Sequence, residues 1–200
     1  MHFTLTDLLT DIAQNGAESG ASIVELHIHE ADSSGKEEFC FTVKDNGKGM
    51  TDTELKSALD PFVSDGTKQT LLKHPHRKVG LGLPFLIQTT EVSGGRWEIK
   101  SIPVVKNDVS VGTGVSGTTV SAWFDLSNVD TPPIGDIPGM FRTVLLFAGP
   151  QEVEIQRIRE TNGELLDYQV RKTELAGALG DLEDSQSLIL LDKYLRSLEN

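Results

Sequence analysis

Asp11 and Asn15 are four residues apart in a segment whose apolar residues recur at helical spacing, so their side chains share one face of a predicted helix. The amide carbonyl of Asn15 is a neutral oxygen that suits a hard cation such as Mg²⁺. Phosphate oxygens and water would fill the other positions around the ion. Asp11 lies where it can orient a water or a hydroxyl, as a catalytic base does. On its own, such a pair equally fits a solvated helix face.

The sequence DNGKGM at residues 45–50 directly follows a predicted strand. Asp45 can accept a hydrogen bond from the amino group of adenine. Gly47 and Gly49 permit the positive φ angles and the close backbone approach that a flat base needs. We include Met50, the last residue of the segment, in the same predicted site. The alternative is a simple β-turn, for which DNG is a common sequence.

The sequence KVGLGL at residues 78–83 opens a predicted helix. Free N–H groups at a helix start bind anions, and glycine leaves room for the ligand. Arg77 and Lys78 stand before this turn and can neutralise phosphate oxygens. Further along, Gly117 and Thr118 begin a strand, and the Thr118 hydroxyl can reach a base or a bridging water. The predicted contacts of the helix start are Gly80, Leu81, Gly82 and Leu83.

In this order, the segments resemble the nucleotide-binding boxes of the GHKL superfamily, named after gyrase, Hsp-type chaperones, histidine kinases and MutL. The boxes are the helical Asn15, residues 45–49, a polar lid, residues 80–83 and the pair Gly117–Thr118. The resemblance covers about residues 1–128. It is closest to the histidine-kinase and anti-sigma serine-kinase branch, because a Pro-Phe pair precedes the lid and GLGL closes it.

The resemblance implies the Bergerat ATP-binding fold, with ATP and Mg²⁺ as cofactors. Asn15 would hold the Mg²⁺ and Asp45 the adenine, beneath a mobile lid over residues 60–79 that contains the basic residue Lys68. The resemblance also implies a catalytic carboxylate, acting as a base, at position 11. That acid is Glu in the ATPase and serine-kinase branches, whereas Asp11 is one methylene shorter and reaches about 1.5 Å less.

Other patterns in the chain do not make a site. Residues 112–117 match GxGxxG, but no helix follows them, which excludes a dinucleotide-binding turn. His27 and His29 alternate on one strand face without a third ligand, so a surface or packing role is the simpler interpretation. Four leucines of the last predicted helix form either a dimer seam or, more simply, a stripe that packs on the chain's own core. They are Leu188, Leu191, Leu195 and Leu198.

A two-layer α/β sandwich would bring the predicted boxes together. Over residues 1–128 the pattern predicts helix, strand, strand, helix, lid, helix, strand and strand. Three prolines within residues 128–138 predict a linker. Residues 129–200 then predict a small C-terminal α+β appendage, in which a hairpin turns at Asn162-Gly163 and two helices follow. We therefore expect two domains, residues 1–128 and residues 129–200.

The composition limits the partners. The chain has 200 residues and a formal charge of −12, from 30 acidic and 18 basic residues. Such a surface repels nucleic acid and anionic lipid, so we expect neither. No apolar stretch is long enough to span a bilayer, and the N-terminus lacks a basic signal-peptide region. Cys40 is the only cysteine, which excludes an internal disulfide. We expect a cytoplasmic protein.

Two functions stay open at this point. One is a stand-alone, histidine-kinase-like enzyme that binds Mg-ATP and transfers phosphate to a separate partner protein, or hydrolyses ATP in complex with it. The other is a nucleotide-dependent binding module with little or no turnover. Residues 129–200 contain no histidine, so no phosphoacceptor histidine lies there. The partner and the oligomeric state stay open, and a homodimer is one option.

Overall fold

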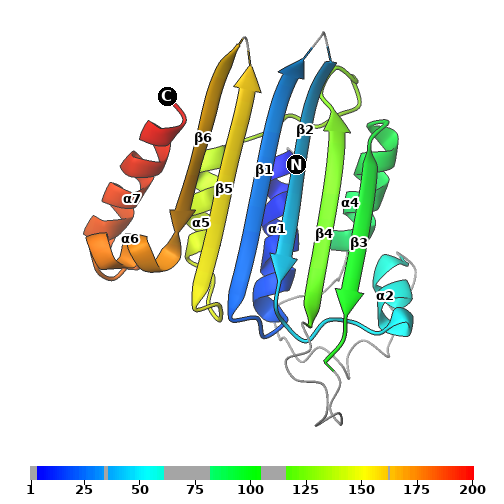
Figure 1. Ribbon diagram of the computed structural model, residues 1–200, viewed down its shortest axis with the longest axis horizontal. Helices are drawn as coiled ribbons and strands as arrows, with labels where there is room; N and C mark the ends of the chain where they lie inside the picture. Colours follow the sequence, from blue (N-terminus) through cyan, green and yellow to red (C-terminus); the bar gives the residue numbers. More distant parts are fainter. Residues whose placement is uncertain (1–3, 34–35, 61–81, 105–115, 162) are drawn as a thin grey trace.

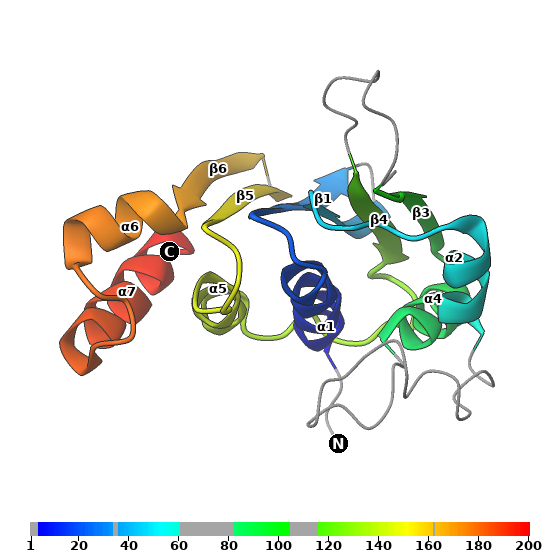
Figure 2. The same ribbon diagram turned by 90° about the horizontal axis from the view of Figure 1, so that it is seen from below.

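The computed structural model describes residues 4–33, 36–60, 82–104, 116–161 and 163–200. They form a six-stranded sheet in the order β3-β4-β2-β1-β5-β6, with a layer of helices on one face (Figure 1 and Figure 2). This arrangement confirms the predicted two-layer α/β sandwich. The elements are α1 (Leu5–Glu18), β1 (Ile23–Ser33), β2 (Lys36–Asp45), α2 (Asp52–Leu59), α4 (Gly82–Val92), β3 (Arg96–Ile102), β4 (Gly117–Asp125), α5 (Ile137–Leu145), β5 (Glu152–Thr161), β6 (Glu164–Arg171), α6 (Lys172–Leu179) and α7 (Ser185–Leu198).

α1 lies at the centre of the helix layer. It begins at a capping box, in which the Thr4 hydroxyl accepts from the N–H of Asp7 and the Asp7 carboxylate accepts from the N–H of Thr4. Its apolar residues pack on the sheet and are almost fully buried: Leu5, Leu8, Leu9, Ile12 and Ala13. The same packing leaves Asp11 exposed and Asn15 half-buried. The burial of α1 therefore fixes the orientation of both candidate site residues.

The sheet has the helix layer on one face and an open face on the other (Figure 2), and the side chains of its strands point to the two faces in turn. Alternate apolar residues of β1 and β2 are buried under the helices: Val24, Leu26, Ile28, Phe39, Phe41 and Val43. Asp45 is the next residue in the inward series of β2 and is only 8% exposed. β2 pairs antiparallel with β4, and the register sets Asp45 opposite Thr118. The alternation of a half-buried strand thus turns a carboxylate toward the helix layer.

The predicted C-terminal hairpin and helices are present. The two strands of the hairpin, β5 and β6, continue the same sheet. β5 pairs in parallel with β1, residues 152–160 against residues 23–31, and β6 then forms the sheet edge. Local patterns do not reveal this pairing, because it joins segments more than a hundred residues apart. One sheet therefore crosses the predicted division at residue 128, and the separation into two domains stays a prediction.

Residues 128–136, the part of the predicted linker 128–138 that precedes α5, form a strap that is bonded to the start of α1. The backbone N–H of Leu5 donates to the carbonyl of Pro133, and that of Thr6 to the carbonyl of Ile134, both at 2.9 Å. A helix start leaves such N–H groups without an internal partner. Gly135 packs so closely that a Cβ there would lie 2.2 Å from Oγ1 of Thr6. The predicted linker is therefore packed on α1, because the strap supplies acceptors that the helix start needs.

A cluster of charged side chains attaches the end of α7 to the sheet. Arg157 of β5 points into the helix layer, its side chain is 1% exposed, and its guanidinium contacts the carboxylates of Glu30 and Glu199. Nη1 of Arg159 lies 3.3 Å from Oε2 of Glu199, and the Tyr168 hydroxyl donates to the same carboxylate. Burial, followed by the Glu199 carboxylate, raises the pKa of the Tyr168 hydroxyl. We call these five residues the arginine cluster.

Within the described ranges, no helix has both the length and the apolar character needed to cross a membrane.

Candidate functional site

The C-terminal half of α1 brings three of the predicted boxes together. Gly16 packs on Asp45, so that a Cβ at Gly16 would lie 3.3 Å from Cβ of Asp45. Gly82, the first residue of α4, packs on the other two candidates: a Cβ there would lie 3.4 Å from Nδ2 of Asn15 and 3.7 Å from Cβ of Asp11. Residues from α1, the end of β2 and the start of α4 thus lie around one helix.

Asp45 is the buried acid of this region. Its Oδ1 accepts hydrogen bonds from the N–H of Gly47 at 2.8 Å and from the hydroxyl of Ser19 at 3.0 Å. Burial raises the pKa of the Asp45 carboxyl, and hydrogen bonds from Gly47, Ser19 and the backbone of Thr118 oppose that rise. A carboxylate has about four lone-pair positions, so these bonds leave it able to accept from a ligand.

The glycines of the DNGKG segment have a packing role inside the protein. A Cβ on Gly47 would lie 1.7 Å from Oγ of Ser19. Gly49 has a φ of +61°, and a Cβ on it would lie 1.9 Å from the carbonyl oxygen of Ile102. The segment is therefore pressed between the end of α1 and the end of β3, which only glycine permits. This packing fixes the backbone beside Asp45.

A chain of hydroxyls continues the site from Asp45 toward β3. The N–H of Met50 donates to Oγ of Ser101 at 2.8 Å, and that oxygen lies 2.8 Å from Oγ1 of Thr118. Thr118 is also the cross-strand neighbour of both Asp45 and Ser101. The structure thus sets Met50 and Thr118, two of the predicted residues, on one network with Ser101.

Sequence reasoning missed three residues that build this region: Ser19, Ser101 and Asn46. Oδ1 of Asn46 accepts from the N–H groups of Ser22 and Ile23, both at 2.9 Å, and so attaches the segment to the start of β1. A serine directly before the glycine that ends a helix could have indicated Ser19. Ser101 and Asn46 gave no local signal, because their partners lie on other strands.

Several predicted residues cannot be placed. Lys68, Arg77, Lys78, Gly80 and Leu81, with nearly all of the predicted lid over residues 60–79, lie outside the described residues. Residues 112–115 of the GxGxxG match do so as well. Leu83 is described, and at 9% exposed it belongs to the hydrophobic core.

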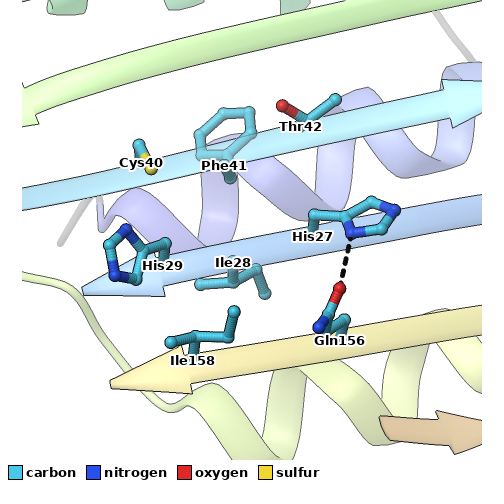
Figure 3. Close-up of a pocket in the computed structure, with 8 residues that line it drawn as sticks. All are labelled: His27, Ile28, His29, Cys40, Phe41, Thr42, Gln156 and Ile158. Carbon is cyan, nitrogen blue, oxygen red and sulfur yellow. Dashed lines mark hydrogen bonds between the residues drawn. The ribbon is translucent and has the colours of Figure 1, made fainter. Parts of the chain in front are cut away.

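The open face of the sheet has a shallow hollow of about 120 Å³ between β1, β2 and β5 (Figure 3). Nδ1 of His27 lies 3.0 Å from Oε1 of Gln156, and Nε2 of His29 lies 3.5 Å from a carboxylate oxygen of Glu160. Burial raises the pKa of the Cys40 thiol, which keeps it protonated. Among the described residues, no three His, Cys, Asp or Glu side chains are grouped as a metal site.

Comparisons with known proteins identify a family over most of the chain. The family model described as histidine kinase-, DNA gyrase B-, and HSP90-like ATPase matches residues 2–128. Among solved structures, the chain is similar to the topoisomerase IV ATP binding domain of Francisella tularensis in complex with a small molecule inhibitor. That domain is 14% identical, and the match covers 81% of this chain and 83% of that one with a TM-score of 0.39. A comparison with curated protein sequences gives no match.

Proposed function

Because the chain belongs to the histidine kinase-, DNA gyrase B- and HSP90-like ATPase family, we propose that it binds ATP with Mg²⁺ along the C-terminal half of α1. One observation carries the proposal: α1 contacts the buried Asp45 through Gly16 and contacts Gly82 through Asn15. Asp45, the acid predicted to bind the base, is thus packed on α1 at Gly16. The preceding residue of that helix is Asn15, the amide predicted to bind the metal.

At the base end, Asp45 accepts the amino group of adenine. Support comes from its burial and from the hydrogen bonds of Gly47 and Ser19, which fix the carboxylate in one orientation before the ligand arrives. Thr118, opposite Asp45 in the register, supplies a hydroxyl beside it. A pre-oriented acceptor binds without a further ordering cost, which favours affinity.

At the phosphate end, Asn15 would hold Mg²⁺ through its amide oxygen. The donor set suits this ion, because a neutral carbonyl and a nearby carboxylate are hard oxygen ligands, and Mg²⁺ takes the rest of its shell from phosphate and water. Bound there, the ion would supply neutralisation of phosphate charge. Gly82 starts α4 beside Asn15, where a Cβ would lie 3.4 Å from the amide nitrogen.

For the activity, we propose a stand-alone, histidine-kinase-like protein that transfers phosphate to a partner protein or hydrolyses ATP in complex with it. Asp11 would be the catalytic base, since it is exposed one helical turn from Asn15. The second candidate is a nucleotide-dependent binding module with little turnover. The shorter reach of Asp compared with Glu at this position favours that alternative. We further propose a cytoplasmic location, because the single cysteine fits a reducing compartment.

The experiment measures binding and turnover separately. Calorimetric titration with Mg-ATP gives the affinity, and release of γ-phosphate gives turnover, both for the parent and for Asp11→Asn. Under the enzyme proposal, Asp11→Asn keeps the affinity and loses turnover by about 10²-fold or more, the usual worth of a general base. Little or no turnover in the parent favours the binding module, and equal, substantial turnover in both proteins removes Asp11 as the base. Absence of Mg-ATP binding contradicts the proposal as a whole.

A further inference from the structure

Three polar side chains lie next to one another where the ends of β2 and β3 meet the start of β4, at one end of the sheet (Figure 1). The register pairs Ser101 of β3 with Thr118 of β4, and Thr118 with Asp45 of β2. Strand alternation turns all three toward the helix layer. Two residues away along the three strands, the same face belongs to the hydrophobic core, at Ile99, Val120 and Val43. A polar row thus replaces the core at this end of the sheet.

A backbone N–H sets the direction of the hydrogen bonds in this row. The N–H of Met50 donates to Oγ of Ser101 at 2.8 Å, and a backbone N–H cannot accept. The single hydroxyl hydrogen of Ser101 has two acceptors nearby, Oγ1 of Thr118 at 2.8 Å and the carbonyl oxygen of Gly117 at 3.4 Å. O–H···O bonds in proteins are about 2.5–3.0 Å long. The distances therefore assign the hydrogen of Ser101 to Thr118.

This assignment leaves the hydrogen of the Thr118 hydroxyl for a ligand. Within the described ranges, that hydroxyl makes no hydrogen bond besides the one with Ser101. The neighbouring carboxylate of Asp45 accepts when it is ionised. The row therefore presents an acceptor next to a donor. Adenine has the complementary pattern, because its amino group donates and the ring nitrogens on either side of that group, N1 and N7, accept.

We propose that Ser101 is a positioning residue of the nucleotide site. By donating to Thr118, it directs the Thr118 hydroxyl at a ring nitrogen next to the adenine amino group. The inference rests on the proposed binding of Mg-ATP with the amino group at Asp45. Hydrogen bonds that run in one direction polarise one another, which strengthens the last bond of the series. Without Ser101 the Thr118 hydroxyl rotates freely and its oxygen lacks a donor, so the bond to the base weakens.

The test is calorimetric titration with three nucleotides in the presence of Mg²⁺: ATP, 1-deaza-ATP and 7-deaza-ATP. Each analogue replaces one of the two ring nitrogens by C–H, so one analogue removes the acceptor and the other is its control. Ser101→Ala removes the hydroxyl, and Ser101→Cys keeps the shape of the side chain but donates weakly. Thr118→Val removes the proposed donor to the base.

Ser121→Ala is the matched control variant. Ser121 also belongs to β4, and its hydroxyl forms the same kind of cross-strand pair, 2.8 Å from Oγ1 of Thr42. That pair lies on the open face of the sheet, away from Asp45. Circular dichroism melts without nucleotide check that every variant folds.

In the parent, we expect one analogue to bind about tenfold more weakly than ATP, the loss of one hydrogen bond, and the other within about twofold. The tenfold difference should vanish in Thr118→Val and fall to about threefold or less in Ser101→Ala, with Ser101→Cys between Ser101→Ala and the parent. Ser121→Ala should keep the whole difference. A purely structural role of Ser101 would weaken all three nucleotides by the same factor and leave the difference unchanged.

An undiminished difference in Ser101→Ala overturns the inference, and so does equal binding of all three nucleotides by the parent. Both results leave the proposed binding of Mg-ATP in place. A parent that binds none of the three nucleotides contradicts the proposed function, and the role of Ser101 with it.

Discussion

Acidic side chains are buried at both ends of the sheet, but the groups that contact them differ between the two ends. At the arginine cluster, two carboxylates, those of Glu30 and Glu199, are neutralised by two guanidinium groups, because Arg157 contacts both of them and Arg159 contacts Glu199. At the other end, the hydrogen-bond donors that Asp45 has among the described residues are neutral, one hydroxyl and two backbone N–H groups. A neutralised cluster serves structure, whereas a buried carboxylate without a cation has a perturbed pKa and is a candidate for function.

The largest effect is expected at the arginine cluster. Arg157→Met keeps the length of the side chain but leaves two carboxylates without their buried cation. Breaking a buried ion pair in this way costs about 3–5 kcal/mol of the free energy of unfolding. Urea unfolding measures the loss, and Arg159→Met is the matched control, because the Arg159 side chain is 31% exposed and shares only Glu199. Similar losses of the free energy of unfolding in the two variants would show that burial of the arginine does not determine its contribution to stability.

The next effect concerns Asp45. Asp45→Asn can still accept from Gly47 and Ser19, but it directs an amide donor at the amino group of the base. We expect the affinity for Mg-ATP to fall by about 1–3 kcal/mol, the cost of a buried unpaired polar group. The free protein should be as stable as the parent or more so, since the substitution removes a buried charge. Thermal melts with and without Mg-ATP measure both quantities. Lower stability of Asp45→Asn with unchanged affinity would make Asp45 a structural residue, like those of the arginine cluster.

The pH dependence of stability tests the buried carboxylate of Asp45. Folding raises the pKa of Asp45 above its ordinary value of 3.8, so the free energy of unfolding due to this group falls as pH rises from 3.8 through the folded value. The stability difference between the parent and Asp45→Asn should therefore be smallest below pH 3.8 and largest above the folded pKa. Urea unfolding over this range tests the direction, and a difference that grows toward acid contradicts the raised pKa.

The smallest effect is expected at Asn15. Asn15→Ala removes one of several ligands of a metal that also binds phosphate and water, so the loss of affinity should be about 1 kcal/mol. The loss should occur with Mg²⁺ and disappear when EDTA replaces it, because the amide oxygen acts through the ion. Calorimetric titration under both conditions measures this. An equal loss without Mg²⁺ would indicate that Asn15 shapes the pocket rather than holding the metal.

The sequence predicted what depends on local periodicity. The apolar spacing of α1, the alternation of β1 and β2, and the Asn-Gly turn between β5 and β6 all predicted elements that are present. It also predicted the GHKL family over about residues 1–128, which the family match over residues 2–128 confirms. The α1 stripe and the strand alternation succeed because the same residues that form the element also form the core.

What the sequence did not predict depends on contacts between distant segments. The parallel pairing of β5 with β1 leaves no local trace, and neither do the hydrogen bonds of the strap to Leu5 and Thr6. Arg157 gave a weak signal, because it follows Val153 and Ile155 in the inward series of β5, yet arginine at such a position is usually exposed. Its two carboxylate partners come from β1 and from the end of α7.

The parallel pairing of β1 with β5 also bears on the order in which the chain can fold during synthesis. β1 is made early, but its partner on one side follows only after about 120 more residues. At roughly 5–20 residues per second, the edge of β1 stays without β5 for some seconds or longer. Pairings across long chain separations are slow to form, and an open edge invites association with other chains. We therefore expect a chain that ends before β5 to aggregate where the full chain does not.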